Sequence, residues 1–165
     1  MNTDGDERTS RSLDFVPTSV GASLGMTNEK AGGEMTGAQR RLVKAARRAR
    51  AKAVAPFSKF KVGAAVETAR GRVYLGCNIE NASYGLTLCA ERVAIFKAVS
   101  EGERRFKRIA VVADTGRLTA PCGACRQIIW EFCGDCEVIM SNLKGKVEVH
   151  RMKELLPVPF DKRQL

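Results

Sequence analysis

Residues Thr87 to Phe96 read TLCAERVAIF, and this stretch lies at the centre of the pattern that decides the fold. Its apolar residues recur as in a helix, and Gly102 follows as a helix-ending residue, so we predict a helix over residues 87–101. Cys89 and Glu91 stand in its first turn, where free backbone N–H groups and the helix dipole favour a thiolate. The question is whether Cys89 and Glu91 take part in a reaction or only stabilise the start of the helix.

Strands and helices alternate on both sides of this stretch. Two strand-like runs, KVGAAVETA and RVYLGCNIE, precede it with Arg70 and Gly71 between them, which predicts a hairpin. After it come the apolar run RIAVVAD, a second helix in PCGACRQIIWEF, the runs EVIMSN and KVEVHR, and a helical turn at MKELLP. An earlier helix starts near Thr36 and ends before Pro56. We therefore expect an α/β fold, a three-layer α/β/α sandwich with a mixed five-stranded sheet.

The composition fits one globular domain that follows a segment of a different kind. The 165 residues are 44% hydrophobic and contain no apolar run long enough to cross a membrane. Residues 1–35 are rich in Gly, Ser, Thr and Asp without periodicity, which predicts a disordered extension before a domain at 36–165. The N-terminus has early acidic residues and no apolar core, so we expect a cytoplasmic protein with neither a secretory signal nor a transit peptide.

The net charge of +10 is unevenly distributed. Residues 1–35 hold six acidic and three basic residues, a charge of −3, which leaves +13 for residues 36–165. Basic residues crowd the predicted first helix between Arg40 and Lys52. This row raises nucleic-acid binding as an alternative, although a solvated helix face on a basic protein is the simpler interpretation.

Three cysteines are placed to bind one metal ion. Cys122 and Cys125 form a Cys-x-x-Cys pair in the first turn of the second helix. If both helices start at the same sheet edge, these sulfurs meet that of Cys89, and three ligands leave the fourth tetrahedral position open, as in catalytic zinc sites. Glu91 would then reach over the metal without binding it and move protons from a water on zinc. Each feature alone has an ordinary structural explanation, but together they indicate one catalytic zinc ion per chain.

Three thiolates would give the zinc site a net charge of −1 and weaken zinc as a Lewis acid. Arg92 and Arg126 each directly follow a residue of the predicted site. Guanidinium N–H groups bonded to sulfur would withdraw charge from the ligands, so both arginines are predicted to lie beside them. Cys133 and Cys136 form a second Cys-x-x-Cys without further ligands in the sequence, and we assign them no metal.

The segments CNIENASYGLTLCAERVAIFKAVSEG and PCGACRQIIWEF, with PFSKFKVGAA upstream and ELLPVPF downstream, closely resemble the small three-cysteine cytidine deaminases. The resemblance covers about residues 37–160. It implies zinc-dependent hydrolysis of cytidine and 2′-deoxycytidine to uridine and 2′-deoxyuridine with release of ammonia, as in pyrimidine salvage. It also implies zinc on the three cysteines, attack of zinc hydroxide on C4 of the base, and Glu91 as the proton shuttle.

The same resemblance implies which residues contact the substrate: Phe60, Asn78, Glu80, Ala90 and Phe160. Asn78 and Glu80 match a pair that holds the ribose hydroxyls, which suits the hydrogen-bonding groups of an amide and a carboxylate. Phe60 matches an aromatic residue beside the base, and Phe160 matches one that reaches a neighbouring subunit's site. The small members are typically homotetramers with shared sites, so we expect a homotetramer here, with a nucleoside as substrate and no membrane partner.

Three alternatives stay open at this point. A blasticidin S deaminase would share the fold and the cysteine in place of a histidine ligand. A polynucleotide (RNA) cytidine deaminase would use the basic helix at 40–52. A non-catalytic zinc-binding scaffold would have no use for Glu91, which argues against it.

Overall fold

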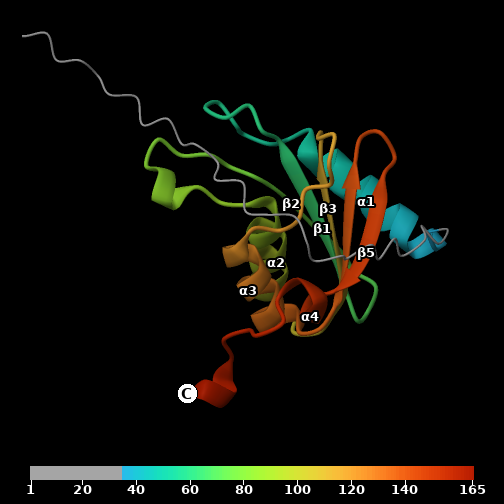
Figure 1. Cartoon of the computed structure of the whole chain (residues 1–165), viewed down its shortest axis with the longest axis vertical. Helices are drawn as coiled ribbons and strands as arrows, with labels where there is room; N and C mark the ends of the chain where they lie inside the picture. The colour runs from blue at the N-terminus through green and yellow to red at the C-terminus, as the bar shows by residue number, and fades with distance from the viewer. Residues whose placement is uncertain (1–34) are drawn as a thin grey trace, which may run out of the picture. The chain divides into compact units, whose positions relative to one another are not determined.

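The computed structural model describes residues 35–165, and the elements in this range follow the predicted order (Figure 1). The helices are α1 (Gly37–Arg50), α2 (Ala90–Ser100), α3 (Gly123–Cys133) and α4 (Met152–Leu155). The strands are β1 (Val62–Thr68), β2 (Val73–Cys77), β3 (Phe106–Ala113), β4 (Glu137–Asn142) and β5 (Val147–Arg151), and the 3₁₀ turns are η1 (Tyr84–Leu86) and η2 (Lys162–Gln164). The predicted extension at 1–35 lies, except for its last residue, outside the described residues. No helix within 35–165 is both long and apolar enough to cross a membrane.

The five strands form one mixed sheet in the order β2-β1-β3-β4-β5. Strands β3 and β4 are parallel, with Arg108 opposite Glu137, and the other neighbouring pairs are antiparallel. A parallel pair requires a crossover connection, and α3 supplies it. The hairpin between β1 and β2 turns through Gly71, which has a φ of 82°. The predicted α/β fold with a mixed five-stranded sheet is therefore confirmed.

The sheet separates two apolar cores because successive strand residues point to opposite faces. On one face, Ala65 and Ile139 belong to the cluster that contains Leu42 of α1. On the other face, Val66 and Val111 belong to the cluster that contains residues of α2 and α3. Figure 1 accordingly shows α1 on the opposite side of the sheet from α2 and α3. This arrangement is the predicted three-layer α/β/α sandwich.

Helix α1 begins at the residue that the sequence predicts. The Thr36 side chain accepts a hydrogen bond from the Gln39 N–H at 3.2 Å, and the Gln39 side chain accepts one from the Thr36 N–H at 2.7 Å. This capping box satisfies two backbone donors that the helix itself cannot pair. Farther along α1, Arg47 donates to the Leu143 carbonyl oxygen at 3.0 Å. Part of the basic row on α1 thus fastens the helix to the turn after β4.

Two glycines allow helices to lie directly on strands. A Cβ atom at Gly63 would lie 2.1 Å from the Ala46 carbonyl oxygen in α1, and one at Gly76 would lie 2.3 Å from the Ala90 carbonyl oxygen in α2. Such distances are far inside van der Waals contact, so only glycine permits these backbone approaches. Gly76 therefore sets the height of the first turn of α2 above the sheet.

A Gly76→Ala substitution is expected to lower the free energy of unfolding by about 1–3 kcal/mol, because the added methyl group forces α2 away from β2. Chemical denaturation measures the change. The matched control is Gly116→Ala, where an added Cβ has no neighbour within 4 Å. Equal stability of the two variants would show that the approach of α2 does not depend on Gly76.

Candidate functional site

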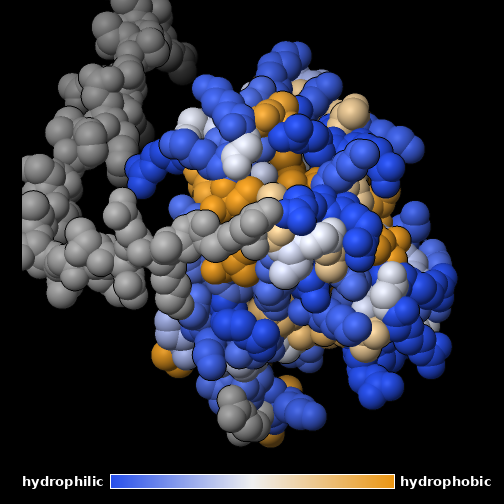
Figure 2. Space-filling model, turned by 90° about the vertical axis from the view of Figure 1, so that its right-hand side faces the viewer, coloured by the Kyte–Doolittle hydropathy of each residue, from blue (hydrophilic) through white to orange (hydrophobic). Residues whose placement is uncertain are grey.

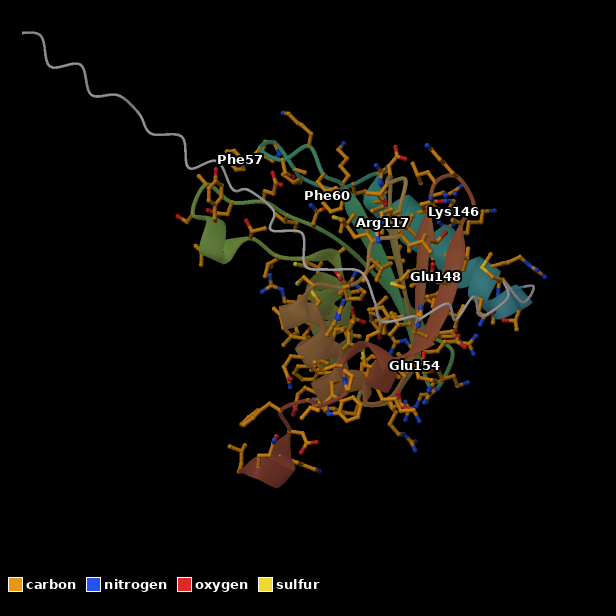
Figure 3. All side chains as sticks on the ribbon, in the orientation of Figure 1. Phe57, Phe60, Arg117, Lys146, Glu148 and Glu154 are labelled. Carbon is orange, nitrogen blue, oxygen red and sulfur yellow. The ribbon has the colours of Figure 1, made fainter. Side chains whose placement is uncertain are left out.

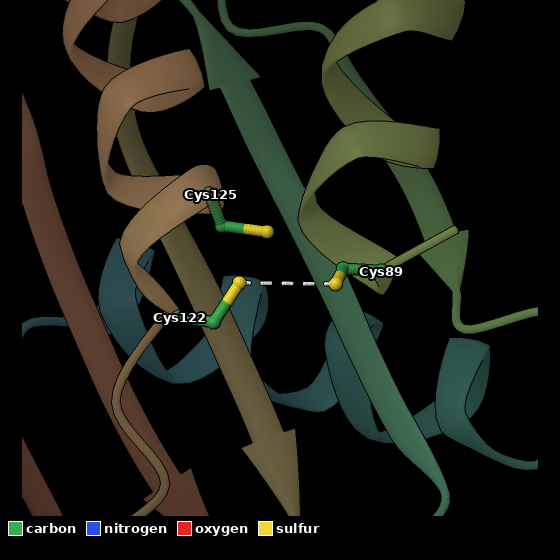
Figure 4. Close-up of side chains that lie close together, drawn as sticks. All are labelled: Cys89, Cys122 and Cys125. Atoms are coloured by element: carbon green, nitrogen blue, oxygen red, sulfur yellow. Dashed lines mark hydrogen bonds between the residues drawn. The ribbon is translucent and has the colours of Figure 1, made fainter. Parts of the chain in front are cut away.

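Three cysteine sulfurs meet at the starts of α2 and α3 (Figure 4). Cys89 is the N-cap of α2, Cys122 is the N-cap of α3, and Cys125 lies in the first turn of α3. All three sulfurs lie within 4.8 Å of one another, and those of Cys89 and Cys122 are 4.0 Å apart. Tetrahedral zinc with Zn–S bonds near 2.3 Å holds its sulfurs about 3.8 Å apart. The cluster therefore has the ligand type and the spacing that zinc requires.

The thiols of Cys89 and Cys125 differ in acidity. The hydrogen bond with Cys125 is the main cause that lowers the pKa of Cys89 to about 5, and the Arg92 guanidinium acts in the same direction. The same contact raises the pKa of Cys125. Because metal ions bind cysteine as thiolate, a divalent cation would displace the remaining thiol protons. Of this pair, Cys89 is therefore the thiolate at neutral pH, and Cys125 keeps its proton until a cation binds.

Arg92 lies beside the first of these sulfurs. Its Nη2 donates to the Thr87 carbonyl oxygen at 2.8 Å and to the Cys89 sulfur at 3.7 Å. Within residues 35–165 its buried Nε has no hydrogen-bond partner. A guanidinium held in this way can withdraw charge from a thiolate ligand and raise the Lewis acidity of the metal.

Arg126 has other partners. Its Nε donates to the Pro121 carbonyl oxygen and its Nη1 to the Leu155 carbonyl oxygen, both at 2.9 Å. No sulfur is among its hydrogen-bond acceptors in the described part of the chain. Arg126 thus joins the start of α3 to the end of α4, and it orients the cysteines of α3 through the backbone.

Glu91 is a buried carboxyl group next to the cysteine cluster. Its exposed fraction is 4%, and burial raises its pKa to about 7. A carboxyl group with a pKa near neutrality can both take up and release a proton in one catalytic cycle. Glu91 lines the same cavity as Cys89 and Cys122, so the acid–base group and the metal ligands act on one space.

The cavity has a volume of about 240 Å³. This is somewhat less than the roughly 300 Å³ at which ligand pockets commonly start. The first turns of α2 and α3 meet the sheet here, at Val62 of β1 and Val111 of β3. Four of the five predicted substrate contacts line the cavity: Phe60, Asn78, Glu80 and Ala90.

The Asn78 side chain holds the loop before β1 at the wall of the cavity through two hydrogen bonds. Its Oδ1 accepts a hydrogen bond from the Val62 N–H, and its Nδ2 donates to the Phe60 carbonyl oxygen, both at 2.8 Å. Figure 3 shows this loop, with Phe57 and Phe60, at the opposite end of the sheet from Glu154 of α4. The aromatic residue and the amide therefore form one structural unit at the rim of the cavity.

The Glu80 carboxylate accepts hydrogen bonds from the same loop. Its Oε2 accepts hydrogen bonds from the N–H groups of Phe57 at 2.8 Å and Ser58 at 3.2 Å, and its Oε1 accepts one from the Ser58 hydroxyl. The bond from the Ser58 side chain is the main cause that holds the pKa of Glu80 below its ordinary value. Glu80 is consequently a carboxylate at neutral pH.

Phe160 does not line this cavity. Its side chain is 57% exposed, and its backbone exchanges two hydrogen bonds with the Gln127 side chain, of 3.3 Å from the Phe160 N–H and 2.6 Å to its carbonyl oxygen. Helix α3 thus holds the backbone at position 160 while the ring stays in solvent. An aromatic ring held in this way is available to another molecule.

Sequence reasoning did not identify Ser58, Thr119 and Ala120 as part of the site, although all three line the cavity. Ser58 lies inside the quoted run PFSKFKVGAA, two residues before Phe60. Its partner Glu80 is 22 positions away, so only the folded chain reveals the contact. The available signal in the sequence was a serine in the loop between Pro56 and Phe60.

The second cysteine pair and the basic helix lie elsewhere in the fold. Cys136 is buried in the apolar core of the α2–α3 side, and Cys133 packs against that core. The basic helix α1 covers the other face of the sheet, where Arg41 and Lys44 are exposed. Figure 2, viewed from the side on which α1 and β5 lie in Figure 1, shows a largely hydrophilic surface with scattered apolar patches.

Comparison with known proteins identifies relatives over most of the described region. The family described as "Cytidine and deoxycytidylate deaminase zinc-binding region" matches residues 36–142. A cytidine deaminase of Sporosarcina psychrophila is 52% identical over 126 residues, which cover 76% of this chain and 93% of that protein. A blasticidin-S deaminase of Bacillus cereus is 33% identical over 111 residues, which cover 62% of this chain and 79% of that protein.

Solved structures show the same similarity in three dimensions. The crystal structure of cytidine deaminase from Burkholderia pseudomallei superposes with a TM-score of 0.73 at 50% identity, covering 76% of this chain and all of that chain. The cytidine deaminase from Mycobacterium tuberculosis superposes with a TM-score of 0.65 at 39% identity, covering 74% and 96% of the two chains.

Replacing Arg92 with Ala is expected to weaken zinc binding by roughly 10–100-fold, because the hydrogen-bond donor beside the Cys89 sulfur is lost. Competition with a chromogenic chelator measures the affinity. Arg104→Ala is the matched control, since that guanidinium bonds carbonyl oxygens of Val99 and Glu103 at the other end of α2. Unchanged zinc affinity in Arg92→Ala would contradict charge withdrawal from the sulfur.

Proposed function

The chain belongs to the cytidine and deoxycytidylate deaminase family, and from this premise we propose that it catalyses hydrolytic deamination of free cytidine and 2′-deoxycytidine. The observation that carries the proposal is the cavity that two cysteines of the cluster share with the buried Glu91 and with the pair Asn78 and Glu80. Water and nucleoside react there to give ammonia and uridine or 2′-deoxyuridine.

Zinc is the cofactor that the family and the cysteine cluster require. The sulfurs of Cys89, Cys122 and Cys125 would hold one ion and leave a fourth tetrahedral position for the reaction. When bound, zinc supplies a Lewis acid that lowers the pKa of water from 15.7 to about 7. Arg92 offsets part of the thiolate charge through its bond to Cys89.

Glu91 moves the protons of the reaction. Its carboxylate takes a proton from the attacking water and passes it to N3 of the pyrimidine. It then takes the second water proton and gives it to the departing amine, so that the C4–N4 bond breaks as ammonia leaves and C4 becomes a carbonyl. The pKa of about 7 suits both directions of transfer.

The cavity favours an uncharged nucleoside over a nucleotide. Its lining contains the carboxyl groups of Glu80 and Glu91, and among residues 35–165 no Lys or Arg lines it. A phosphate group would meet a carboxylate without a compensating cation, which costs binding energy. Phe60, Asn78, Glu80 and Ala90 would orient the base and the sugar.

Glu91→Gln is expected to lower kcat for cytidine by at least 10²–10⁴-fold, because an amide cannot shuttle protons. The assay follows conversion of cytidine to uridine at matched zinc content. Glu131→Gln on the exposed side of α3 is the control and should behave as the parent. Full turnover by Glu91→Gln would remove Glu91 from the mechanism, and no turnover by the zinc-loaded parent would remove the nucleoside assignment.

Deamination of blasticidin S is the alternative function, because a blasticidin-S deaminase of Bacillus cereus is a 33% identical relative. Offering blasticidin S in the same assay separates the two substrates. A polynucleotide deaminase would need its basic surface at the cavity, whereas the row on α1 lies across the sheet from it. Single-stranded RNA as a third substrate tests that possibility.

We also infer a homotetramer in which Phe160 completes the site of a neighbouring subunit. The Phe160 ring is largely in solvent and outside its own chain's cavity. On the outer faces of α2 and α3, Phe96 and Phe132 stack edge to face at 5.9 Å while 40% and 36% exposed. Exposed apolar area of this kind suits a contact between subunits.

Recycling of pyrimidine nucleosides in the cytoplasm is the setting we infer for this enzyme.

Phe160→Ala is expected to lower kcat/KM for cytidine about tenfold, because an aromatic contact with the substrate is lost. Co-expression with Glu91→Gln tests whether Phe160 acts between subunits. In mixed oligomers, a Phe160→Ala subunit retains Glu91 and receives Phe160 from its Glu91→Gln neighbour, so activity should exceed that of either variant alone. Activity equal to the average of the two separate variants would mean that Phe160 acts within its own chain or not at all.

A further inference from the structure

We propose that the outer side of α1 binds the phosphate backbone of a double-stranded nucleic acid. Its exposed cations Arg41, Lys44 and Arg48 form the surface that we call the basic face. Helix α1 lies across the sheet from α2 and α3, whose first turns carry the cysteine cluster (Figure 1). Binding at this face would take place without deamination and does not depend on the proposed function.

The spacing of the three cations places them on one side of the helix. Their positions differ by three and by four residues, whereas Leu42 and Ala49 are buried on the side that faces the sheet. The rise from Arg41 to Arg48 along the helix axis is about 10 Å. One strand of a duplex carries a phosphate about every 3.4 Å, so the basic face spans roughly three phosphates.

Neighbouring acidic residues do not neutralise the basic face. Helix α1 contains no acidic residue, and within residues 35–165 the side chains of Arg41, Lys44 and Arg48 have no hydrogen-bond or ion-pair partner. Arg41 and Arg48 line a hollow between α1 and β2 together with Glu67. The Glu67 carboxylate is mostly buried and pairs with Arg108 on β3 at 3.4 Å, so it does not bond to either arginine of α1. An anion is therefore the partner that this surface lacks.

Two lysines of the turn after β4 lie beside α1 as well. The Arg47 guanidinium donates to the carbonyl oxygens of Asn142 at 3.3 Å and Leu143 at 3.0 Å, which holds this turn against the helix. Lys144 and Lys146 are exposed in the same turn. A phosphate backbone that crosses α1 would consequently meet further positive charge next to the basic face.

The residue types on the outer side of α1 distinguish between anionic partners. Among residues 35–165, none of the large apolar side chains that are exposed lies in α1. A membrane-bound helix inserts such side chains between lipids, and a single-stranded nucleic acid stacks its bases on exposed aromatic rings. The phosphates of a duplex require only cations, and guanidinium groups bind phosphate through two parallel hydrogen bonds. A duplex is thus the partner that fits, and contacts to its backbone carry no sequence preference.

Fluorescence anisotropy with labelled DNA and RNA duplexes of about 20 base pairs tests the proposal on the zinc-loaded full chain. The slope of log K against log salt between about 50 and 200 mM should be about −2.7 or steeper, because each of three phosphates contributes about −0.9. Replacing Arg41, Lys44 and Arg48 together with Gln should reduce the slope by about 2.7 and weaken binding at about 50 mM salt at least tenfold.

Two further variants separate the basic face from net charge. Replacing Lys97, Lys107 and Lys153 with Gln removes three exposed cations from α2, β3 and α4, and this variant should bind the duplex as the parent does. Arg41→Lys combined with Arg48→Lys retains the charge and should retain the salt slope. All variants should keep the thermal unfolding and the cytidine turnover of the parent, because the cavity lies on the other side of the sheet.

Equal weakening by the control variant and by the basic-face variant would overturn the proposal, because net charge would then hold the duplex. Absence of duplex binding by the parent at about 50 mM salt would overturn it as well. Tighter binding to a single strand of the same length, or binding only to vesicles of phosphatidylserine, would assign the surface to a different partner and overturn the duplex. Failure of the parent to deaminate cytidine would concern the proposed function alone.

Discussion

The absence of a side chain at Gly76 is the constraint on which the site depends. It lets the backbone of α2 rest directly on β2, at the turn that contains Ala90 and Ala94. Cys89 caps this turn and Glu91 belongs to it, so their height above the sheet follows from a backbone contact. Helix α3 follows β3 in the same sheet. The position of α2 on β2 and that of α3 after β3 therefore together determine how near Cys122 and Cys125 come to Cys89.

Burial and one arginine reduce the repulsion between the negative groups of the site. Three thiolates and a carboxylate within one cavity would repel each other strongly in a low-dielectric environment. Burial raises the pKa of Glu91 to about 7, which lowers its average negative charge near neutral pH, and Arg92 lies against the Cys89 sulfur. Three sulfur ligands would leave one coordination position of a zinc ion open, unlike the four ligands of a structural zinc site.

The sugar side of the cavity follows a different principle, in which the ligand-binding groups also hold the loop together. Asn78 and Glu80 bond backbone groups of the loop at 57–62, so the side chains expected to contact ribose also position Phe60, the aromatic residue expected beside the base. Ser58 joins these contacts through one hydroxyl, and the left-handed conformation of Lys59 is the cost of that geometry. Such preorganisation reduces the entropy that a substrate must otherwise offset on binding.

Local sequence determined which elements form, and the motif spacing indicated the metal ligands. Alternation placed Ala65 and Val66 on opposite faces, the Thr36–Gln39 capping box started α1, and Cys-x-x-Cys after Pro121 identified the helix start that carries two sulfurs. Only the tertiary structure decided the partners of Arg126, the exposure of Phe160 and the bond between Ser58 and Glu80. The physical reason is range: capping and periodicity act between residues a few positions apart, whereas a contact across 22 or more positions exists only after the sheet has brought its strands together.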